Sequence, residues 1–373
     1  MIYLDNAATT LVKPPAVARA MVQAMRSCAS PGRGGHAAAM RASQLVYRCR
    51  EKAAALFHVP DPENVVFTMN ATHGLNIAIR SLVKPGTKVL ISGYEHNAVT
   101  RPLKALGAEI MIAASPLFDR AACLRAFEER IGEAELVVCT MVSNVFGFIL
   151  PVEEIAAACR RRGVPLIVDA SQAAGVLPVD FEALGAAFAA MPGHKGLLGP
   201  QGTGLLLCGE LGEALIYGGS GSDSLLQQMP DYLPDRLEAG THNVPGIAGL
   251  LAGMEYVSRR GVHAIMRAER ELLEDAVSQL ADAPGLELFT GKADSQSGVL
   301  SLRIRGLDCD EAAQLLSQRG ICLRSGLHCA PLAHHSAGTL DTGTVRMSFS
   351  PFAARPEVRT CCAAVRELCA GAR

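Results

Sequence analysis

Two residues with complementary chemistry follow consecutive apolar runs in the middle of the chain. The run at 166–168 leads into Asp169, and the run at 187–191 is followed by the segment 192–195, which ends in Lys195. Ligands of open α/β sheets bind at the carboxyl ends of the strands, so we expect the carboxylate and the amine to share a site. The pair suits pyridoxal phosphate, because a lysine binds its aldehyde as a Schiff base and an aspartate keeps its pyridine nitrogen protonated. Taken singly, Asp169 is equally typical of a helix N-cap and Lys195 of a solvated surface charge.

Cys329 is the candidate nucleophile. A cysteine attacks as the thiolate, so it must be accessible and must lie near positive charge. Arg324 and His328 are close in the sequence and are expected to supply that charge. Gly326 and Pro331 predict a loop around the thiol rather than a core strand.

The other cysteines and the nearby histidines form no recognised metal motif. The chain has 12 cysteines but no CxxC pair, so neither a zinc ribbon nor a thioredoxin-type site is predicted. Most of the cysteines are expected to be small core residues. The group His328, Cys329, His334 and His335 has a spacing that fits no zinc pattern, so we expect no metal and interpret the pair at 334 and 335 as incidental.

The elements that must position these residues alternate along the chain. Apolar runs of strand length occur at 65–68, 89–92, 136–141, 165–169 and 204–208, and helix-like stretches lie between them at 74–83, 98–106, 120–131 and 152–162. Strands without in–out alternation, separated by helices, predict an α/β fold with a mostly parallel sheet covered by helices on both faces. Pro14 and Pro15 are well placed to begin a first helix.

A second, smaller layer is predicted toward the end of the chain. A long helical stretch at 246–280 reads as a connector, followed by strand-like runs at 286–290 and 298–305 and by helical stretches at 310–319 and 356–370. We therefore expect a large cofactor-binding α/β domain at 15–260. A small α+β domain is expected to combine 1–14 with 261–373.

Composition excludes several classes of protein. Lys and Arg number 35 and Asp and Glu 36, so the net charge of −1 lacks the basic excess of a nucleic-acid-binding protein. No apolar run reaches the ~20 residues of a membrane helix, and residues 1–5 do not resemble a signal peptide, so we expect a soluble cytoplasmic protein without a membrane partner. No nucleotide-binding glycine motif is present, and the glycine-rich segment 199–204 is interpreted as a turn.

Several further segments, in this order along the chain, resemble the cysteine desulfurase family. This family belongs to the class V aminotransferases, whose fold is that of fold type I pyridoxal-phosphate enzymes. The matching segments are Tyr3–Thr10, Asn70–Asn76, Glu95–Ala98, Asp169–Gln172, Gly193–Lys195, Arg324–Ala330 and Arg346–Ser348. The segment Arg324–Ala330 is similar to the R-[ST]-G-x-H-C-A loop of the group II (SufS-like) branch. The resemblance covers nearly the whole chain.

The resemblance implies a role for each matched residue. The implied catalytic residues are Lys195, Cys329 and His96, the last stacking on the pyridine ring. The implied cofactor-binding residues are Lys195, Asp169, Gln172, His194, Thr72, His73, His96, Asn144 and Thr241. Among these, Gln172 is expected to hydrogen-bond the phenolic oxygen, Thr72 and His194 the phosphate, and Thr241 the phosphate of a partner subunit in a homodimer. The implied substrate-binding residues are Arg346, Asn144 and Arg324. Without the motif, Arg346 would be read as part of a surface ion pair, since its guanidinium suits any carboxylate.

The resemblance also implies a reaction. L-Cysteine would yield L-alanine, and the sulfur would be held as a persulfide on Cys329 before passing to an acceptor, such as an iron–sulfur assembly scaffold or a thiol. The alternatives are selenocysteine lyase, another class V reaction such as transamination, and a non-catalytic scaffold. Three features depart from the family pattern: His73 stands in place of a common Glu, Pro192 in place of a common Ser, and the segment 330–344 is shorter.

Overall fold

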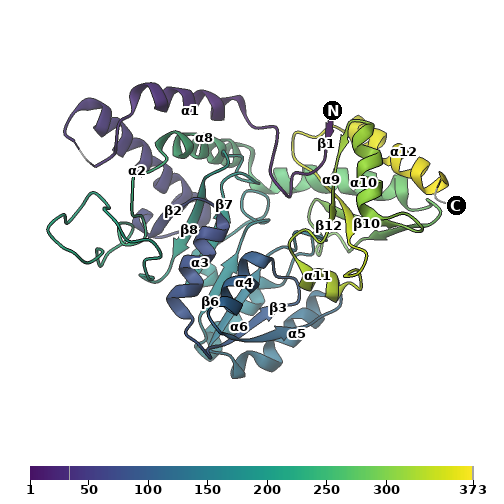
Figure 1. Ribbon diagram of the computed structural model, residues 1–373, viewed down its shortest axis with the longest axis horizontal. Helices are drawn as coiled ribbons and strands as arrows, with labels where there is room; N and C mark the ends of the chain where they lie inside the picture. Colours follow the sequence, from purple (N-terminus) through teal and green to yellow (C-terminus); the bar gives the residue numbers. More distant parts are fainter. Residues whose placement is uncertain (33, 372–373) are drawn as a thin grey trace.

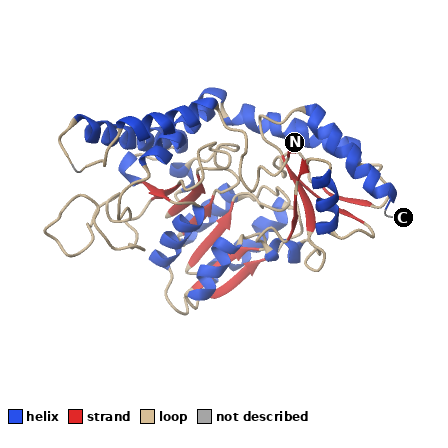
Figure 2. Cartoon of the chain, turned by 45° about the horizontal axis from the view of Figure 1, so that its top comes forward, coloured by secondary structure: helices blue, strands red, loops and turns tan. Residues whose placement is uncertain are grey.

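A computed structural model describes residues 1–32 and 34–371 of the chain (Figure 1). The larger part of the molecule is built around one sheet, and a smaller part, which contains the C-terminus, is built around another. Figure 2 shows the helices, in blue, around the strands, in red. Within the described residues, no helix combines the length and the apolar character that crossing a membrane requires.

The large sheet has seven strands in the order β2-β8-β7-β6-β5-β3-β4. Their bounds are β2 Val65–Thr68, β3 Lys88–Ser92, β4 Glu109–Ala113, β5 Leu136–Thr140, β6 Leu166–Asp169, β7 Phe188–Pro192 and β8 Gly204–Cys208. The pairs among β4, β3, β5, β6 and β7 are parallel, whereas β8 runs antiparallel to both β2 and β7. The predicted, mostly parallel α/β sheet is therefore confirmed. The direction of β8 did not follow from its apolar run, because strand direction depends on the connection before it.

Helices cover both faces of this sheet, as predicted. They are α1 Pro15–Ser27, α2 Ala37–Phe57, α3 Ala71–Leu82, α4 Asn97–Ala105, α5 Arg120–Arg130, α6 Val152–Arg162, α7 Phe181–Leu184 and α8 Val244–Arg260. The inner strands are buried because one hydrophobic cluster fills the space on each side of the sheet, whereas the edge strand β4 is partly exposed. Local signals begin and end these helices: Pro15 occupies the first turn of α1, Asp119 caps α5, and Gly163 ends α6 with a φ of 65°.

The small sheet has four strands in the order β12-β13-β10-β9. Their bounds are β9 Leu286–Phe289, β10 Val299–Ile304, β12 Arg324–Gly326 and β13 Thr344–Ser348. Helices α9 Val262–Leu280, α10 Cys309–Gln318 and α12 Arg355–Gly371 contribute to a separate hydrophobic cluster against this sheet, and α11 Pro331–Ser336 follows β12. The N-terminal strand β1 Ile2–Tyr3 pairs in parallel with β11 Ile321–Cys322. These clusters support the division into 15–260 and 1–14 plus 261–373, which stays a prediction.

The predicted single helical stretch at 246–280 is two helices. Gly261 separates α8 from α9 and has φ 81° and ψ 133°, a conformation that a residue with a Cβ adopts only with strain. The hydrophobic pattern continues across this break, so periodicity alone did not show it. The sequence reading also missed α2, whose apolar residues are interspersed with polar ones, and β4, whose apolar run of four residues is short.

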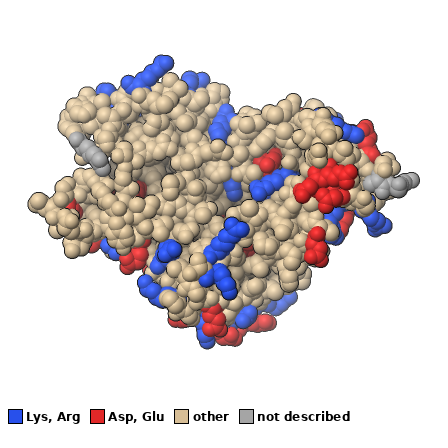
Figure 3. Space-filling model, in the orientation of Figure 1, with Lys and Arg blue, Asp and Glu red and all other residues tan. Residues whose placement is uncertain are grey.

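Charges on the surface are mixed in sign. Figure 3 shows basic and acidic side chains interspersed on one face of the described part of the chain, with uncharged surface between them. This distribution matches the net charge of −1.

Candidate active site

A cavity of about 100 Å³ lies at the carboxyl edge of the large sheet. Asp169 is the last residue of β6, and Lys195 follows the end of β7, the parallel neighbour of β6. Both side chains line this cavity, as the strand pattern predicted. The structure brings further predicted residues to the same cavity, namely Thr72, His96, Asn144, Gln172 and His194.

Lys195 carries an amine whose basicity is reduced by its surroundings. Burial lowers the pKa of Lys195 to about 8, the carboxylate of Asp169 opposes this shift, and the guanidinium groups of Arg346 and Arg324 add to it. A lysine with such a pKa is partly neutral near pH 8 and can act as a nucleophile or a base. Asp169 accepts a hydrogen bond from the backbone N–H of Ser171 at 2.9 Å through Oδ1.

The N-terminus of α3 forms one wall of the cavity. The side chain of Asn70 caps this helix by accepting from the backbone N–H of His73 at 2.9 Å, so Thr72 does not have to serve as the cap. Thr72 lines the cavity, where a helix N-terminus favours an anion. His194 stands opposite with its Nδ1 3.0 Å from Oγ1 of Thr9. Burial, reinforced by Lys195 and Lys13, lowers the pKa of His194 to about 4, so this imidazole is neutral at pH 7.

His96 begins α4, and its orientation is set by that helix. Its Nδ1 accepts a hydrogen bond from the backbone N–H of Ala98 at 3.0 Å, which leaves Nε2 as the protonated nitrogen. Burial lowers the pKa of His96, and the carboxylate of Asp169 opposes this shift. The ring therefore enters the cavity as a neutral imidazole held by a helix cap.

Glu95 is a buried acid beside this cavity that the sequence reading did not single out. It is fully buried, and its Oε1 accepts from Oγ of Ser92 at 2.5 Å and from the backbone N–H of Thr140 at 2.8 Å. Burial raises the pKa of Glu95 to about 8 against these two hydrogen bonds, and the charge of Asp169 adds to the rise. Glu95 is therefore protonated at pH 7, and only its place in the segment Glu95–Ala98 pointed to it.

The first residues of the chain are hydrogen-bonded to two residues that line the cavity. Gln172 donates a hydrogen bond from Nε2 to the carbonyl of Ala7 at 3.0 Å. Thr10 donates from Oγ1 to the carbonyl of His194 at 3.0 Å. The matched segment Tyr3–Thr10 thus contacts the two segments that carry the predicted cofactor residues, although it lies more than 150 residues away from them in the sequence.

Cys329 lies in a tight turn after β12, as the loop prediction proposed. Its side chain is exposed, and Nη2 of Arg324 contacts its Sγ at 3.7 Å. The backbone N–H of Asn97, at the start of α4, donates to the carbonyl of Cys329 at 2.8 Å and holds the turn against the large sheet. This contact places a positive charge beside the sulfur.

The expectation that His328 supplies positive charge to Cys329 is wrong. His328 is 2% exposed, and burial, with help from Arg346, lowers its pKa to about 2. A buried imidazole next to a guanidinium is neutral at any pH at which the protein works. Arg324 is the positive group that contacts the sulfur.

Arg346 is fully buried and does not form a surface ion pair. Its Nη2 donates to Oδ1 of Asp5 at 2.7 Å, and its Nη1 donates to the carbonyl of Asn144 at 2.8 Å. Burial lowers the pKa of Arg346, and the charge of Asp5 opposes the shift. Arg346 and Arg324 are directly opposite in the antiparallel pair β12–β13. Asp5 was missed as a site residue, because no local pattern distinguishes it from any acid near a strand.

Asn144 joins the two parts of the site. Its side chain donates from Nδ2 to the carbonyl of His328 at 2.8 Å, while its own carbonyl accepts from Arg346. One residue of the large sheet region therefore positions both the turn that carries Cys329 and the buried arginine. The predicted contact of Asn144 with the cofactor or the substrate stays a prediction.

Two of the predicted cofactor-binding residues lie outside the cavity that Asp169 and Lys195 line. His73 and Thr241 line a neighbouring cavity of about 220 Å³. Within one chain they are not brought to the cavity that Asp169 and Lys195 line. Thr241 is exposed.

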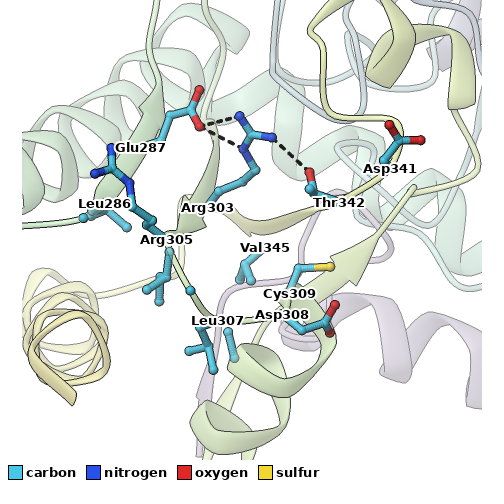
Figure 4. A pocket seen from close by; sticks show the side chains of 14 residues that line it. Leu286, Glu287, Arg303, Arg305, Leu307, Asp308, Cys309, Asp341, Thr342 and Val345 are labelled. Carbon is cyan, nitrogen blue, oxygen red and sulfur yellow. Dashed lines mark hydrogen bonds and ion pairs between the residues drawn. The ribbon is translucent and has the colours of Figure 1, made fainter. Parts of the chain in front are cut away.

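A larger cavity of about 810 Å³ lies in the small part of the molecule (Figure 4). Arg303 crosses one side of it and donates to Glu287 and to Oγ1 of Thr342. Cys309 also lines this cavity, but none of the predicted site residues does. The chemistry predicted from the sequence therefore belongs to the cavity of about 100 Å³ that Asp169 and Lys195 line.

The residues around the cavity of Asp169 and Lys195 fit pyridoxal phosphate by the chemistry of their functional groups. A primary amine and a carboxylate stand at the ends of adjacent strands, a neutral imidazole enters from α4, and a hydroxyl and a helix N-terminus face the same space. These are the groups that an aldehyde, a pyridine nitrogen, an aromatic ring and a phosphate require. Among residues 1–32 and 34–371, no cluster of three or more His, Cys, Asp or Glu is placed to hold a metal ion.

Comparisons with known proteins extend this picture to nearly the whole chain. Residues 2–360 match the family model described as aminotransferase class-V. A protein named probable cysteine desulfurase from Methanothermobacter thermautotrophicus is 33% identical over 374 residues, covering 96% of this chain and 92% of that protein. A protein of the same name from Mycolicibacterium paratuberculosis is 31% identical over 388 residues, which cover 100% of this chain but 56% of that longer protein. The apo structure of a cysteine desulfurase from Thermococcus onnurineus NA1 superposes with a TM-score of 0.90 at 31% identity, covering 99% of this chain and 95% of the other.

Proposed function

The chain belongs to the class-V aminotransferase family of pyridoxal-phosphate-dependent enzymes, and from this premise we propose that it is a cysteine desulfurase. The observation that carries the proposal is the placement of Cys329. Its exposed thiol contacts Arg324, and its turn is hydrogen-bonded to Asn144, which lines the cavity of Lys195 and Asp169, and to Asn97, whose neighbours His96 and Ala98 line it. A cofactor site and a thiol in a turn attached to its lining are what sulfur removal from an amino acid requires. The relatives named cysteine desulfurase support this reading.

The cofactor would be held by the residues that share the cavity. Lys195 would bind it covalently, Asp169 would pair with its ring nitrogen, His96 would cover the ring, and Thr72 and His194 would hold the phosphate. When bound, pyridoxal phosphate withdraws electrons from the substrate Cα, so that the bonds at Cα and Cβ weaken. The role of Gln172 toward the phenolic oxygen is part of the same proposal, and its hydrogen bond to Ala7 fixes the side chain for that role.

Substrate binding and proton transfer are assigned to Arg346 and Lys195. A buried guanidinium is a strong partner for the α-carboxylate of an amino acid, and Asp5 and Asn144 hold it in place. Lys195 would take the proton from Cα and pass it to the cofactor, since its pKa of about 8 lets the amine both accept and give up a proton near neutral pH. Arg324 lies close enough to Cys329 to orient both the thiol and the approaching substrate.

Cys329 would take the sulfur. Its thiolate attacks the sulfur of the substrate, the Cβ–S bond breaks as the new S–S bond forms, and a proton replaces sulfur at Cβ. In total, L-cysteine and the thiol of Cys329 give L-alanine and a persulfide on Cys329. The persulfide would pass to an acceptor protein or thiol, with iron–sulfur cluster assembly as one destination.

Three other functions remain as competing candidates. Selenocysteine lyase would use the same site and depend less on Cys329, because selenium leaves more readily. A different class V reaction, such as transamination, would not need the exposed thiol beside Arg324. A non-catalytic scaffold would not need to retain Lys195 and Asp169 in this cavity. The placement of Cys329 favours the desulfurase over the last two.

We also propose a homodimer in the cytoplasm, with each subunit divided into the two predicted domains. Thr241 is exposed and lines a cavity away from Lys195, which supports a contact with the cofactor phosphate of a partner rather than of its own chain. Dilution that separates the subunits should then release cofactor, and Thr241→Val should weaken cofactor retention. A fully active monomer would contradict the proposal. Assignment to the SufS-like branch stays a prediction.

The decisive experiment measures alanine and sulfide released from L-cysteine by the cofactor-loaded protein, with and without a reducing thiol. L-Selenocysteine is the parallel substrate. Alanine formation from L-cysteine that depends on Cys329 supports the desulfurase. Turnover of L-selenocysteine alone supports the lyase. Formation of pyruvate or another keto acid supports another class V reaction.

A further inference from the structure

Two buried histidines are stacked beneath the turn that carries Cys329. His328, which precedes the thiol, is 2% exposed, and His334, on α11, is fully buried. Their ring centroids are 5.7 Å apart and their planes differ by 22°, while Phe146 packs against His334 at 5.7 Å from the other direction. The pair therefore connects the residue beside Cys329 to the core of the large sheet.

Each ring is oriented by hydrogen bonding to a threonine, and Nε2 of His328 lies within reach of both the carbonyl and the hydroxyl of Thr344. Nδ1 of His334 lies 2.7 Å from Oγ1 of Thr339, and Nε2 of His328 lies 3.2 Å from the carbonyl of Thr344. A carbonyl only accepts, so Nε2 of His328 carries the proton and donates it. Burial lowers the pKa of His328 to about 2 and that of His334 to about 4, so both rings are neutral near pH 7. Neutral rings pack against each other without the repulsion that two imidazolium groups would have.

The turn above this pair has an unfavourable backbone conformation. His328 has a φ of 50° and Cys329 a φ of 58°, so two consecutive residues with a Cβ occupy the left-handed region. Such a conformation persists only where the surrounding structure holds it. The carbonyls of both residues are held from the large sheet region, that of His328 by Asn144 and that of Cys329 by Asn97. The side chain of His328 is a third anchor, because its Nε2 is bonded to Thr344 and its ring is stacked on His334.

We propose that His334 is a positioning residue for Cys329. Through its stack with His328 it keeps the turn left-handed, and it thereby keeps the sulfur exposed and in contact with Arg324. This inference rests on the proposed function, in which Cys329 is the nucleophile. It assigns a role to a residue whose sequence context, beside His335, indicated none.

The test compares His334→Ala and His334→Phe with a matched control, His335→Ala. His335 is the next residue of the same helix but is exposed, so its removal should leave the turn unchanged. Two rates are measured on cofactor-loaded protein: alkylation of Cys329 by iodoacetamide at pH 7 without substrate, followed by peptide mapping, and alanine release from L-cysteine. Thermal unfolding and cofactor content report whether each variant is folded.

We expect His334→Ala to slow alkylation of Cys329 by at least about threefold and to lower kcat at least about tenfold, because the thiol loses its contact with Arg324. The KM for L-cysteine and the cofactor content should stay within about twofold, since Lys195 and Arg346 do not depend on the stack. His334→Phe keeps a ring of similar size and should restore most of both rates. His335→Ala should match the wild type.

Wild-type alkylation and kcat in a folded His334→Ala protein would overturn the proposal, as would an equal loss in His335→Ala. If His334→Ala does not fold, Thr339→Val is measured instead, which removes the hydroxyl that contacts the ring and the carbonyl of His334. Slower rates support the proposal and unchanged rates overturn it. The alkylation rate is read without substrate. Failure of the desulfurase assignment, seen as alanine release by Cys329→Ala, is therefore distinguishable from failure of this inference.

Discussion

Asp5 and Arg346 form a buried ion pair of 2.7 Å that joins the beginning of the chain to the small sheet. The arginine side chain is 1% exposed and that of the aspartate 19%, so the pair is largely removed from water. Breaking such a pair leaves a buried charge without its partner. The same bond holds the guanidinium that we assign to the substrate carboxylate.

Asp5→Asn should therefore lower the free energy of unfolding by about 3 kcal/mol and weaken binding of L-cysteine. Urea unfolding of the cofactor-free protein and the KM for L-cysteine measure the two effects. Asp282→Asn is the control, because Asp282 pairs with Arg366 on the surface and its loss should change neither quantity. Equal stability of the two variants would show that the buried pair contributes nothing.

Lys195→Ala should abolish covalent attachment of pyridoxal phosphate. The wild-type protein should be yellow, and borohydride should fix the cofactor to the peptide that contains Lys195. Lys84→Ala, which removes an exposed lysine, should behave like the wild type. Recovery of the labelled cofactor on any other peptide would refute the assignment of the site.

Asp169→Asn should reduce kcat by roughly 100-fold or more, at about 1.36 kcal/mol per tenfold, because the ring nitrogen loses its negative partner. Asp180→Asn tests the competing explanation, since Asp180 caps α7 by accepting from Ala183 and is remote from the cavity. If Asp169 were only a cap, the two variants would lose stability alike and keep their activity. Steady-state alanine release and thermal unfolding separate these cases.

Cys329 should be the first cysteine to react with an alkylating agent. All 12 cysteines are free, but Cys329 is exposed, whereas eight others are buried and Cys28, Cys309 and Cys322 are partly buried. Burial also raises the pKa of thiols such as Cys159, which keeps them protonated and unreactive. Mass spectrometry after brief treatment measures the order of labelling.

Cys329→Ala should bind cofactor and substrate but release no alanine from L-cysteine. Cys309→Ala is the control, because Cys309 lines the larger cavity and has no place in the proposed reaction. A persulfide detected on Cys329 after one turnover would agree with the mechanism. Alanine release at the wild-type rate by Cys329→Ala would leave a pyridoxal-phosphate enzyme with a different reaction.

Glu95 should make the stability of the protein fall between pH 5 and pH 8. Burial raises its pKa from the ordinary 4.5 to about 8, so the folded protein keeps a proton that the unfolded chain releases. The stability contributed by this proton is fully present below pH 4.5 and is lost as the pH rises through 8. At about 1.36 kcal/mol per pKa unit, the loss amounts to several kcal/mol.

Glu95→Gln keeps a neutral hydrogen-bonding group at this position and should remove that part of the pH dependence. Urea unfolding at pH 5 and pH 8 should show the variant gaining stability relative to the wild type as the pH rises. Glu109→Gln, at an exposed position, should follow the wild type. Parallel stabilities of wild type and Glu95→Gln at both values would mean that Glu95 is already ionised when folded.

The sequence by itself determined the α/β class and most strands of the main sheet, and it singled out the residues to which we assign the cofactor and the nucleophile. Apolar runs of strand length located β2, β5, β6 and β8 to within a residue or two, since strands buried on both faces consist mostly of apolar residues. Asp169 and Lys195 could be placed together because both follow consecutive strands, and consecutive parallel strands are neighbours in such folds. Cys329 was identified by its segment and by the glycine and proline around it.

Tertiary structure alone decided how these residues are held. Asp5 and Arg346 are 341 residues apart, and no periodicity relates them. They meet because Asp5 forms a parallel bridge with Ser348 of β13, the strand that carries Arg346. His328 looked like a source of positive charge in the sequence, but packing against His334 removes it from water and keeps it neutral. The charge of a histidine depends on its burial, and burial depends on contacts between distant segments that local sequence does not encode.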